Sequence, residues 1–396
     1  MNHSGASSRL PPARRLRVLY FCEGFTDIRF VAGLSEICDL TMAVPARAYA
    51  ESGLKDRVAE SGAALAVREI PGGRPTFQAR SFAYLWTAIR RFDVVLSQEV
   101  LRGSLNATVV GTIRKVPVVT CMNTAPVEYF RCRRECGQVG WLTAVAGETF
   151  IRAVMAVNGR LATRCLALGP YLREVAARSC PRVGAGYYYG VDVDLFRPAD
   201  DAERARLRLR TDLPSDRFLV LLSSRISHEK DPETVLRATS LARSRGLDAV
   251  LVNLGGGYQQ FLDLARRLSL PDPERWVIGR PAVHPMRDLA DYYRAVDLVA
   301  QASLAEGLGF SPLEALACGT PVVATSVGGM AVQLDGYARL TPRRDPGAMA
   351  DQMLWVAAHQ PEAREQALRG REHVCLHWNR RTAFAELGAV LEAVCD

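Results

Sequence analysis

The sequence predicts an α/β protein made of two doubly wound domains. Short apolar segments rich in β-branched residues alternate with helical patterns, which is typical of parallel sheets covered by helices on both faces. This strand–helix series begins again near residue 217, and 396 residues favour two domains over one. We expect a first domain over 17–190, a second over 191–378, and a final helix within 379–396.

In the first domain, apolar segments predict the strands of one parallel sheet and helical patterns separate them. Residues 1–16 are small, polar and basic with two prolines, so we expect a disordered tail and no signal peptide. The segment 165–168 is expected to be the last strand before a crossover at 187–198. The predicted strands are 17–22, 40–44, 92–97, 116–121 and 165–168, and the helical segments are 30–37, 82–90 and 107–114.

The second domain repeats this organisation. Several of its predicted strands run into glycine-containing loops at their carboxyl ends, the edge at which open α/β sheets bind ligands. A final amphipathic helix covers about 380–394. The predicted strands are 217–223, 249–254, 276–278, 298–300 and 322–324, with a helix at 233–245.

The segment 302–329 carries the strongest functional signal. A loop containing Gly307 and Gly309 leads into a helix that Ser311 would open as an N-cap, with Pro312 as its first residue. We expect Gly319 to end this helix, and residues 328–329 to form a further loop. Free N–H groups at a helix N-terminus favour an anion such as phosphate.

Two carboxylates bracket this loop, Glu306 and Glu314, with seven residues between them. Carboxylates suit hydroxyl groups, so phosphate and hydroxyls together indicate a nucleotide with a ribose, or a nucleotide sugar. Ser311 and Glu314 also have the spacing of a capping box, in which Glu314 would only stabilise the helix. The two interpretations differ in whether loss of Glu314 weakens binding of the nucleotide.

Composition narrows the class of protein. Ten cysteines without a signal peptide favour free thiols in a reducing cytoplasm, and no apolar run is long enough to span a membrane. Residues 1–190 contain 25 Lys and Arg against 14 Asp and Glu, a net charge of +11, whereas the remainder has a net charge of −3. The arginines are dispersed, which disfavours nucleic acid but leaves open a weak contact with an anionic membrane.

The ordered motifs resemble those of the retaining glycosyltransferases of family 4, which have the GT-B fold. The resemblance covers nearly all of the chain and is strongest after residue 189. The motifs are Ser224-Arg225-x4-Lys230, Glu306-x7-Glu314, Gly190-Val-Asp-x3-Phe196, Val327-Gly328-Gly329 and Asp345-Pro346. The resemblance implies two Rossmann-like domains facing each other across a cleft, with the C-terminal helix crossing back to the N-terminal domain.

The resemblance also implies roles on the donor side. Arg225 and Lys230 would hold the donor diphosphate and neutralise the leaving phosphate, Glu314 would bind the ribose, and Glu306 would face the donor sugar. We therefore expect Arg225, Lys230 and Glu306 to be catalytic. The remaining donor-binding residues would be Ser224, Gly307, Gly309, Phe310, Ser311, Leu313, Arg280 and Gly24. Because Pro312 has no N–H, the helix-end donors would come chiefly from Phe310, Ser311 and Leu313.

The first domain departs from the family pattern. The loop after its first strand keeps only one glycine, Gly24, so its share of donor binding is open. Asn123 stands where many members have a histidine, and His3 in the tail is the only histidine of the N-terminal half. An imidazole base from that half is excluded. The leaving phosphate oxygen would then accept the acceptor's proton, or a carboxylate would assist, either Glu23, Asp27, Glu99 or Glu128.

The acceptor is expected in the first domain, where Glu23, Asp27, Asn123 and Glu128 would contact it. Its acids suit a small polar or cationic acceptor, such as the aminocyclitol precursor of an aminoglycoside in antibiotic biosynthesis. The basic charge favours instead a lipid-linked or membrane-surface acceptor in cell-envelope assembly. A nucleotide-sugar epimerase of the same fold is a further alternative.

We expect a cytoplasmic enzyme whose donor is a nucleotide diphosphate sugar, most readily UDP-linked. No cofactor and no metal are expected, because the only close cysteine pair outside the strands, Cys132 and Cys136, has no histidine nearby. Weak peripheral contact with a membrane remains an alternative to a fully soluble location, and the sequence leaves the oligomeric state open.

Overall fold

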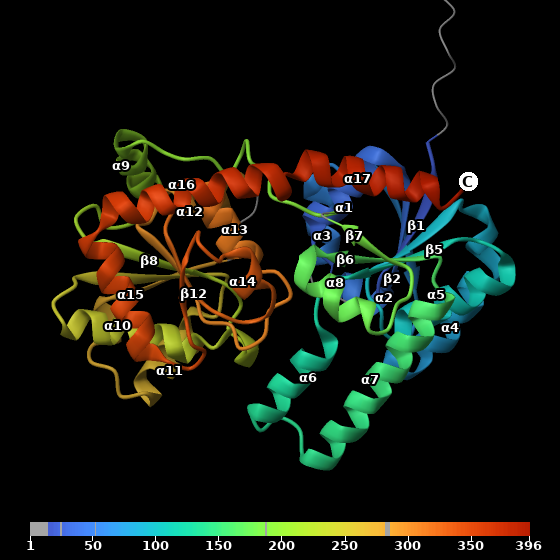
Figure 1. Ribbon diagram of the computed structural model, residues 1–396, viewed down its shortest axis with the longest axis horizontal. Coiled ribbons are helices and arrows are strands. Elements are labelled where there is room, and N and C mark those ends of the chain that lie inside the picture. The colour runs from blue at the N-terminus through green and yellow to red at the C-terminus, as the bar shows by residue number, and fades with distance from the viewer. Residues whose placement is uncertain (1–14, 24–25, 52, 187, 282–285) are drawn as a thin grey trace, which may run out of the picture.

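The computed structural model describes residues 15–23, 26–51, 53–186, 188–281 and 286–396. Within them the chain forms two parallel sheets with helices on both faces, as predicted (Figure 1). The N-terminal sheet has seven described strands in the order β3-β2-β1-β4-β5-β6-β7, and the C-terminal sheet has six in the order β10-β9-β8-β11-β12-β13. Both orders place the first strand of the domain inside the sheet, as in dinucleotide-binding folds.

The N-terminal domain is built on central apolar strands that are almost completely buried. Its strands are β1 Arg17–Phe21, β2 Asp39–Pro45, β3 Leu65–Ile70, β4 Val94–Ser97, β5 Val118–Met122, β6 Arg164–Leu168 and β7 Val183–Gly186. Its helices are α1 Ile28–Ile37, α2 Ala46–Glu51, α3 Leu54–Ser61, α4 Arg74–Ala88, α5 Arg102–Arg114, α6 Pro126–Glu135, α7 Trp141–Leu161 and α8 Gly169–Ala177, and a 3-10 turn, η1 Ile89–Arg91, follows α4.

The C-terminal domain has the same alternation. Its strands are β8 Phe218–Ser223, β9 Ala249–Leu254, β10 Val277–Arg280, β11 Leu298–Gln301, β12 Val322–Thr325 and β13 Arg339–Thr341. Its helices are α9 Asp201–Arg210, α10 Pro232–Ser244, α11 Tyr258–Arg267, α12 Met286–Ala295, α13 Phe310–Ala317, α14 Gly328–Gln333, α15 Pro346–Ala358 and α16 Gln360–His377, with 3-10 turns η2 His228–Lys230 and η3 Pro273–Arg275.

The structure differs from the expectation at three elements. The segment 165–168 is not the last strand of its domain, because β7 pairs beside it, and β3 was not expected at all. The strands β3 and β7 both lie at sheet edges. β3 contains exposed charged residues and β7 contains two glycines, so neither shows the apolar pattern of the central strands. The predicted loop at 328–329 is instead the start of α14.

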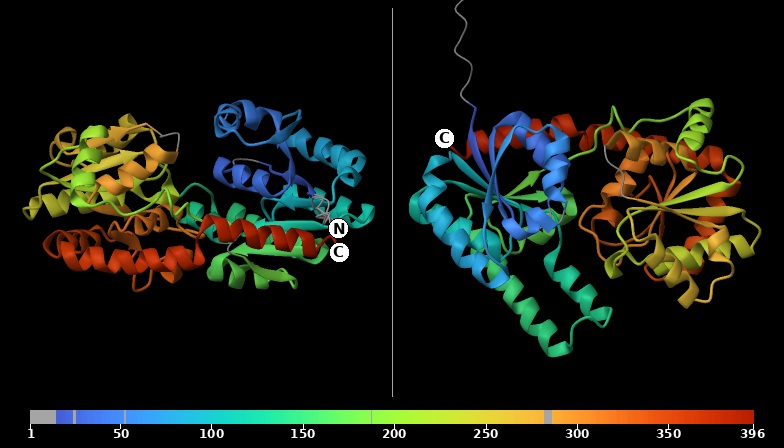
Figure 2. Two further views of the ribbon diagram at one scale, coloured as in Figure 1. Left: turned by 90° about the horizontal axis from the view of Figure 1, so that it is seen from above. Right: turned by 180° about the vertical axis from the view of Figure 1, so that it is seen from behind.

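The final helix, α17 Arg380–Ala393, returns to the N-terminal domain and packs on α1 and β7. Figure 2 shows α16 and α17 running in succession along one side of both domains. The Phe384 ring of α17 fits against Gly33, where a side chain on α1 would collide with it. The two chain connections between domains lie side by side, since Val191 pairs with Asn379.

Candidate active site

The loop that joins β11 to α13 lies where the two domains meet. A Cβ on Gly307 would come within 2.5 Å of the carbonyl oxygen of Asn123, which follows β5 in the other domain. On its own side the loop is held by α14, because the N–H of Gly329 donates to the Glu306 carbonyl at 3.0 Å. Cβ atoms at 328 or 329 would overlap the backbone of this loop, so the Gly-Gly pair permits the contact.

The helix α13 begins two residues earlier than the sequence suggested. Gly309 is its N-cap with φ +91°, and Ser311 lies inside the first turn, where its hydroxyl lies 2.9 Å from the Tyr293 hydroxyl. Leu313 is not a free helix-end donor, because its N–H bonds to the Gly309 carbonyl and its side chain is buried. The interpretation of Ser311 and Glu314 as a capping box is therefore wrong. The free hydrogen-bond donors at this helix end are the N–H groups of Phe310 and Ser311.

Lys230 and Glu306 form an ion pair at this loop, and their side chains are 17% and 12% exposed. Lys230 comes from the η2 turn after β8. Ser303 donates to the same Glu306 oxygen at 3.1 Å and is in turn bonded by Gln301. The structure therefore brings together one predicted diphosphate ligand and the carboxylate predicted to face the sugar.

The remaining predicted donor residues are arranged more loosely. Arg225 is 78% exposed, with its guanidinium 3.8 Å from Glu229. Ser224 lies beside Gly255, whose positive φ lets it approach the Ser224 carbonyl. Arg280 at the end of β10 donates to the carbonyl and carboxylate of Asp212. Phe310 packs against Tyr189, with ring centroids 4.5 Å apart and the rings tilted by 48°. Gly24 lies outside the described residues.

Glu314 is buried and its partner comes from the other domain. Its carboxylate accepts a hydrogen bond from Arg29 of α1. Burial raises the pKa of Glu314, and Arg29 and Tyr293 only partly oppose that shift. This contact of Arg29 could not be predicted, because the segment 26–30 carries no motif and indicates only the start of a helix.

The four residues expected to contact the acceptor are already engaged. Asp27 caps α1 and binds Arg29 at 2.7 Å and the Tyr189 hydroxyl at 2.6 Å. Burial alone would raise the pKa of Asp27, but Arg29 and Tyr189 outweigh it and hold the pKa below its usual range. Glu23 accepts from Gln78 and Arg102, Glu128 from Tyr171, and Asn123 bonds the Gln98 carbonyl and the Tyr188 hydroxyl.

A cavity of about 1060 Å³ lies at the carboxyl ends of β1, β2 and β4 in the N-terminal domain. Glu23 and Arg102 line it, as do Arg47 and Glu51, which pair with each other. Glu99 also lines it, and one oxygen of its carboxyl group is buried without a hydrogen-bond partner among the described residues. Burial raises the pKa of Glu99 to about 8. The carboxylates of this cavity are therefore neutralised by arginines or by a proton.

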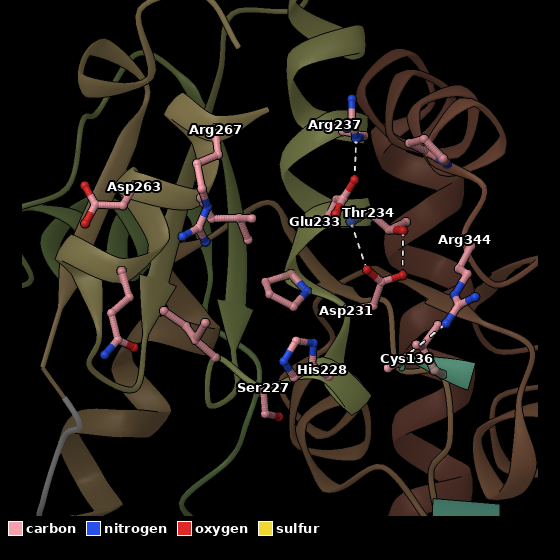
Figure 3. A pocket seen from close by; sticks show the side chains of 16 residues that line it. Cys136, Ser227, His228, Asp231, Glu233, Thr234, Arg237, Asp263, Arg267 and Arg344 are labelled. Atoms are coloured by element: carbon pink, nitrogen blue, oxygen red, sulfur yellow. Dashed lines mark hydrogen bonds and ion pairs between the residues drawn. The ribbon is translucent and has the colours of Figure 1, made fainter. Parts of the chain in front are cut away.

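A second cavity, of about 800 Å³, lies beside the loop that contains Arg225 and Lys230. In Figure 3, Ser227 and His228 from this loop face it from one side and Arg267 of α11 from the other. Asp231 caps α10 there through Thr234, and Arg344 donates to the Cys136 sulfur. Lys230, Glu306 and Glu314 do not line it. This cavity was not predicted from the sequence.

Comparisons with known proteins decide the family. Residues 203–373 match the family described as Glycosyl transferases group 1. D-inositol 3-phosphate glycosyltransferase 1 of Catenulispora acidiphila is 31% identical over 341 residues, which cover 77% of this chain and 78% of that protein. The chain belongs to the glycosyl transferases group 1 family. The D-inositol 3-phosphate glycosyltransferase of Saccharomonospora viridis is 38% identical over 219 residues, 52% of this chain and about half, 49%, of that relative.

Solved structures support the GT-B fold of this glycosyltransferase. HepE of Anabaena, in complex with UDP-glucose, has a TM-score of 0.74 at 16% identity and covers 95% of this chain and 100% of its own. Sucrose-phosphate synthase of Thermosynechococcus elongatus has a TM-score of 0.72 at 16% identity, with coverages of 96% and 99%. The predicted fold class is confirmed.

Proposed function

We propose that this glycosyltransferase transfers a sugar from a UDP-linked donor to a hydroxyl of a small polyhydroxylated ring, with retention of configuration and without a metal. The observation that carries the proposal is the Lys230–Glu306 pair beside the glycine-rich start of α13. A solved structure of the same fold has UDP-glucose bound, which supports the choice of donor.

In this proposal each part of the nucleotide sugar is bound by its own protein groups. Lys230 stabilises the negative charge that grows on the diphosphate as the bond to the sugar breaks, and Arg225 supplies a second cation. The N–H groups of Phe310 and Ser311 stand at the positive N-terminal end of α13 and complete the phosphate contacts. Glu306, fixed by Ser303, accepts hydrogen bonds from sugar hydroxyls, and Glu314 accepts from the ribose.

Retention follows if the acceptor hydroxyl attacks the sugar carbon from the face that the diphosphate leaves. The new bond joins the acceptor oxygen to that carbon, the bond to phosphate breaks, and the departing phosphate oxygen takes the proton. This route needs no protein base, which fits a site in which Asn123 replaces an imidazole and is already bonded at both ends of its amide. Among the described residues no group of three metal-ligating side chains occurs.

The acceptor is assigned to the cavity of about 1060 Å³ in the N-terminal domain. Its paired charges and the protonated Glu99 offer donors and acceptors for several hydroxyls without a strong net charge. Two relatives are named for an inositol phosphate, a polyhydroxylated ring. An aminocyclitol antibiotic precursor shares that ring but carries amines, so the two acceptors differ in the charge that the cavity must accept.

A donor and acceptor screen tests this proposal. UDP-glucose, UDP-N-acetylglucosamine and GDP-mannose are each incubated with the enzyme and EDTA, and release of the nucleotide diphosphate is followed. D-inositol 3-phosphate and a diaminocyclitol are then added in separate reactions. We expect faster UDP release with one of the rings and an unchanged anomeric configuration in the product. Release that requires a divalent metal, or a sugar changed while still on its nucleotide, would contradict the proposal.

A further inference from the structure

The helices α6 and α7 form a hairpin, residues 126–161, that projects from the body of the enzyme. Views from opposite sides show it extending beyond both sheets, with α6 between α7 and the C-terminal domain (Figures 1 and 2). The base of α7 packs on α5, and α6 touches the η2 turn. None of the residues proposed to bind the donor lies in this α6–α7 hairpin.

The outward face of α7 is largely apolar. Trp141, Leu142 and Phe150 are 67%, 75% and 58% exposed, and Val145 and Val157 are exposed as well. At 100° per residue these five positions fall on one half of the helix, together with the exposed Ala146, Thr149 and Ala153. They form a stripe about 24 Å long, from the rise per residue of a helix. The exposed Arg152 and Arg160 lie within the same half, so the apolar stripe includes two arginines.

This stripe is not the result of a poorly packed helix. Ala144, Val154, Met155 and Asn158 of the same helix are buried on its inner side. Asn158 donates to the carbonyls of residues 100 and 101 at the start of α5. Single exposed apolar residues are ordinary, but a contiguous stripe on a helix anchored this firmly indicates a surface that contacts something else.

Positive charge surrounds the stripe. The hairpin contains Arg131, Arg133, Arg134, Arg152 and Arg160, and no lysine or aspartate. Its three glutamates are all engaged: Glu128 by Tyr171, Glu135 by Arg343, and Glu148 by Arg131 at 3.0 Å. Arg343 and Arg344 of the C-terminal domain lie against the hairpin where α6 ends, beside Glu135 and Cys136.

We propose that the α6–α7 hairpin is a membrane-docking element that rests on an anionic lipid bilayer. Trp141 and Leu142 at the start of α7 would enter the interface between headgroups and acyl chains, and the arginines would contact lipid phosphates. Tryptophan favours that depth because its ring is apolar and its N–H is polar. Charge favours the bilayer over a second copy of the chain, since two hairpins of this charge repel each other.

No helix among the described residues is long and apolar enough to cross a bilayer, so the proposed contact lies on the surface. The proposal does not depend on the identity of donor or acceptor. It places the enzyme at the inner face of a membrane even when the acceptor is a small soluble molecule.

The test uses the full chain and vesicles of equimolar phosphatidylglycerol and phosphatidylcholine, with pure phosphatidylcholine vesicles for comparison. We expect co-sedimentation with the anionic vesicles at low salt, reversed at high salt. Acyl chains brominated near the headgroup should quench tryptophan fluorescence in the wild type. In Trp141→Phe they should quench it much less, while binding persists.

Two variants and their matched controls locate the contact. The double variant Trp141→Ser/Leu142→Ser should lower the bound fraction about tenfold. The control Leu376→Ser should leave it unchanged, because it removes a leucine side chain that is 72% exposed but lies on α16. Arg133→Glu should lower it about fivefold, and Arg369→Glu on α16 makes the same charge change without that effect. Circular dichroism and thermal midpoints check that each variant is folded.

Three outcomes would overturn the proposal. The first is a wild type that ignores anionic vesicles at low salt, and the second is a double variant that binds them as the wild type does. The third is a self-associating wild type whose double variant becomes monomeric, which would make the stripe a contact between copies. Slow UDP release from UDP-glucose without vesicles reports on the donor site separately, and we expect the double variant to keep it.

Discussion

Arg29 at the start of α1 donates a hydrogen bond to Glu314 of α13, although 285 positions separate the two residues in the sequence. The same guanidinium binds Asp27 and lies 5.8 Å from the centre of the Phe310 ring. The carboxylate that the family resemblance assigns to the ribose is thus held by a cation of the opposite domain. Donor binding in the proposed mode therefore adds the ribose to a carboxylate that already has a partner from the opposite domain.

Arg29→Met should destabilise the protein, because it leaves Glu314 and Asp27 buried without their cation. The expected loss is about 3 kcal/mol, the scale for removing one partner of a buried ion pair. Urea unfolding measures it. Arg47→Met serves as the control, since Arg47 and Glu51 are both largely exposed and their pair contributes less than about 1 kcal/mol. Equal losses in the two variants would contradict a structural role for the Arg29–Glu314 contact.

Lys230→Ala should lower turnover about a hundredfold or more, because the charge that develops on the leaving diphosphate loses its buried cation. The measurement is UDP release with the donor and acceptor found in the screen. Lys55→Ala on α3 is the control, since it removes the same side chain far from the loop. A folded Lys230→Ala enzyme with wild-type turnover would remove Lys230 from the mechanism.

Glu314→Gln and Glu306→Gln should show which of the two carboxylates binds the ribose and which contacts the transferred sugar. Loss of the Glu314 charge should weaken UDP binding about tenfold, the scale of one hydrogen bond to a charged group. Glu306→Gln should leave UDP affinity within about twofold and lower turnover instead, because UDP lacks the transferred sugar that Glu306 would contact. Calorimetric titration with UDP and steady-state kinetics give the two readouts. The opposite pattern would exchange the two assignments.

Glu99 should make stability depend on pH. Its pKa is raised from an ordinary value of 4.5 to about 8, so the folded state holds this proton more tightly than the unfolded state does. The resulting stabilisation is complete below about pH 4.5 and is lost as the pH rises through about 8. Glu99→Gln keeps the neutral form at every pH. We expect its unfolding free energy to fall about 3.5 kcal/mol less than that of the wild type between pH 5 and 8. Parallel profiles from urea unfolding would contradict the raised pKa.

The sequence was sufficient for the fold and for the donor-side loop. Apolar strands followed by glycine turns are local signals, and so is the spacing of Glu306 and Glu314. The edge strands β3 and β7 were missed because their side chains are exposed or small. The start of α13 was misplaced because a serine before a proline looks like an N-cap, whereas Gly309 adopts the left-handed conformation that ends the loop.

The acceptor side could not be predicted, because the partners of its carboxylates come from distant segments. Asp27 looked available to a ligand, yet Tyr189 reaches it from 162 positions away. Glu23 is neutralised by Arg102, and one oxygen of Glu99 is buried without a hydrogen-bond partner among the described residues. A cluster of acids in the sequence is therefore not a cluster of free carboxylates in the structure.

The side-by-side connections at Val191 and Asn379 determine how the two domains can move. The N–H of Val191 bonds the Trp378 carbonyl at 2.6 Å, and the Arg380 N–H bonds the Val191 carbonyl at 2.9 Å. Both covalent links therefore form one hinge, and a rigid opening of the enzyme must turn about it. The contacts that cross between the domains include two ion pairs, Arg29 with Glu314 and Arg343 with Glu135, and an apolar cluster of Cys132 with Leu304 and Ala305. Salt should weaken the more exposed Arg343–Glu135 pair, whereas the buried Arg29–Glu314 pair is screened much less, so it is this buried pair that should keep the domains together at high ionic strength.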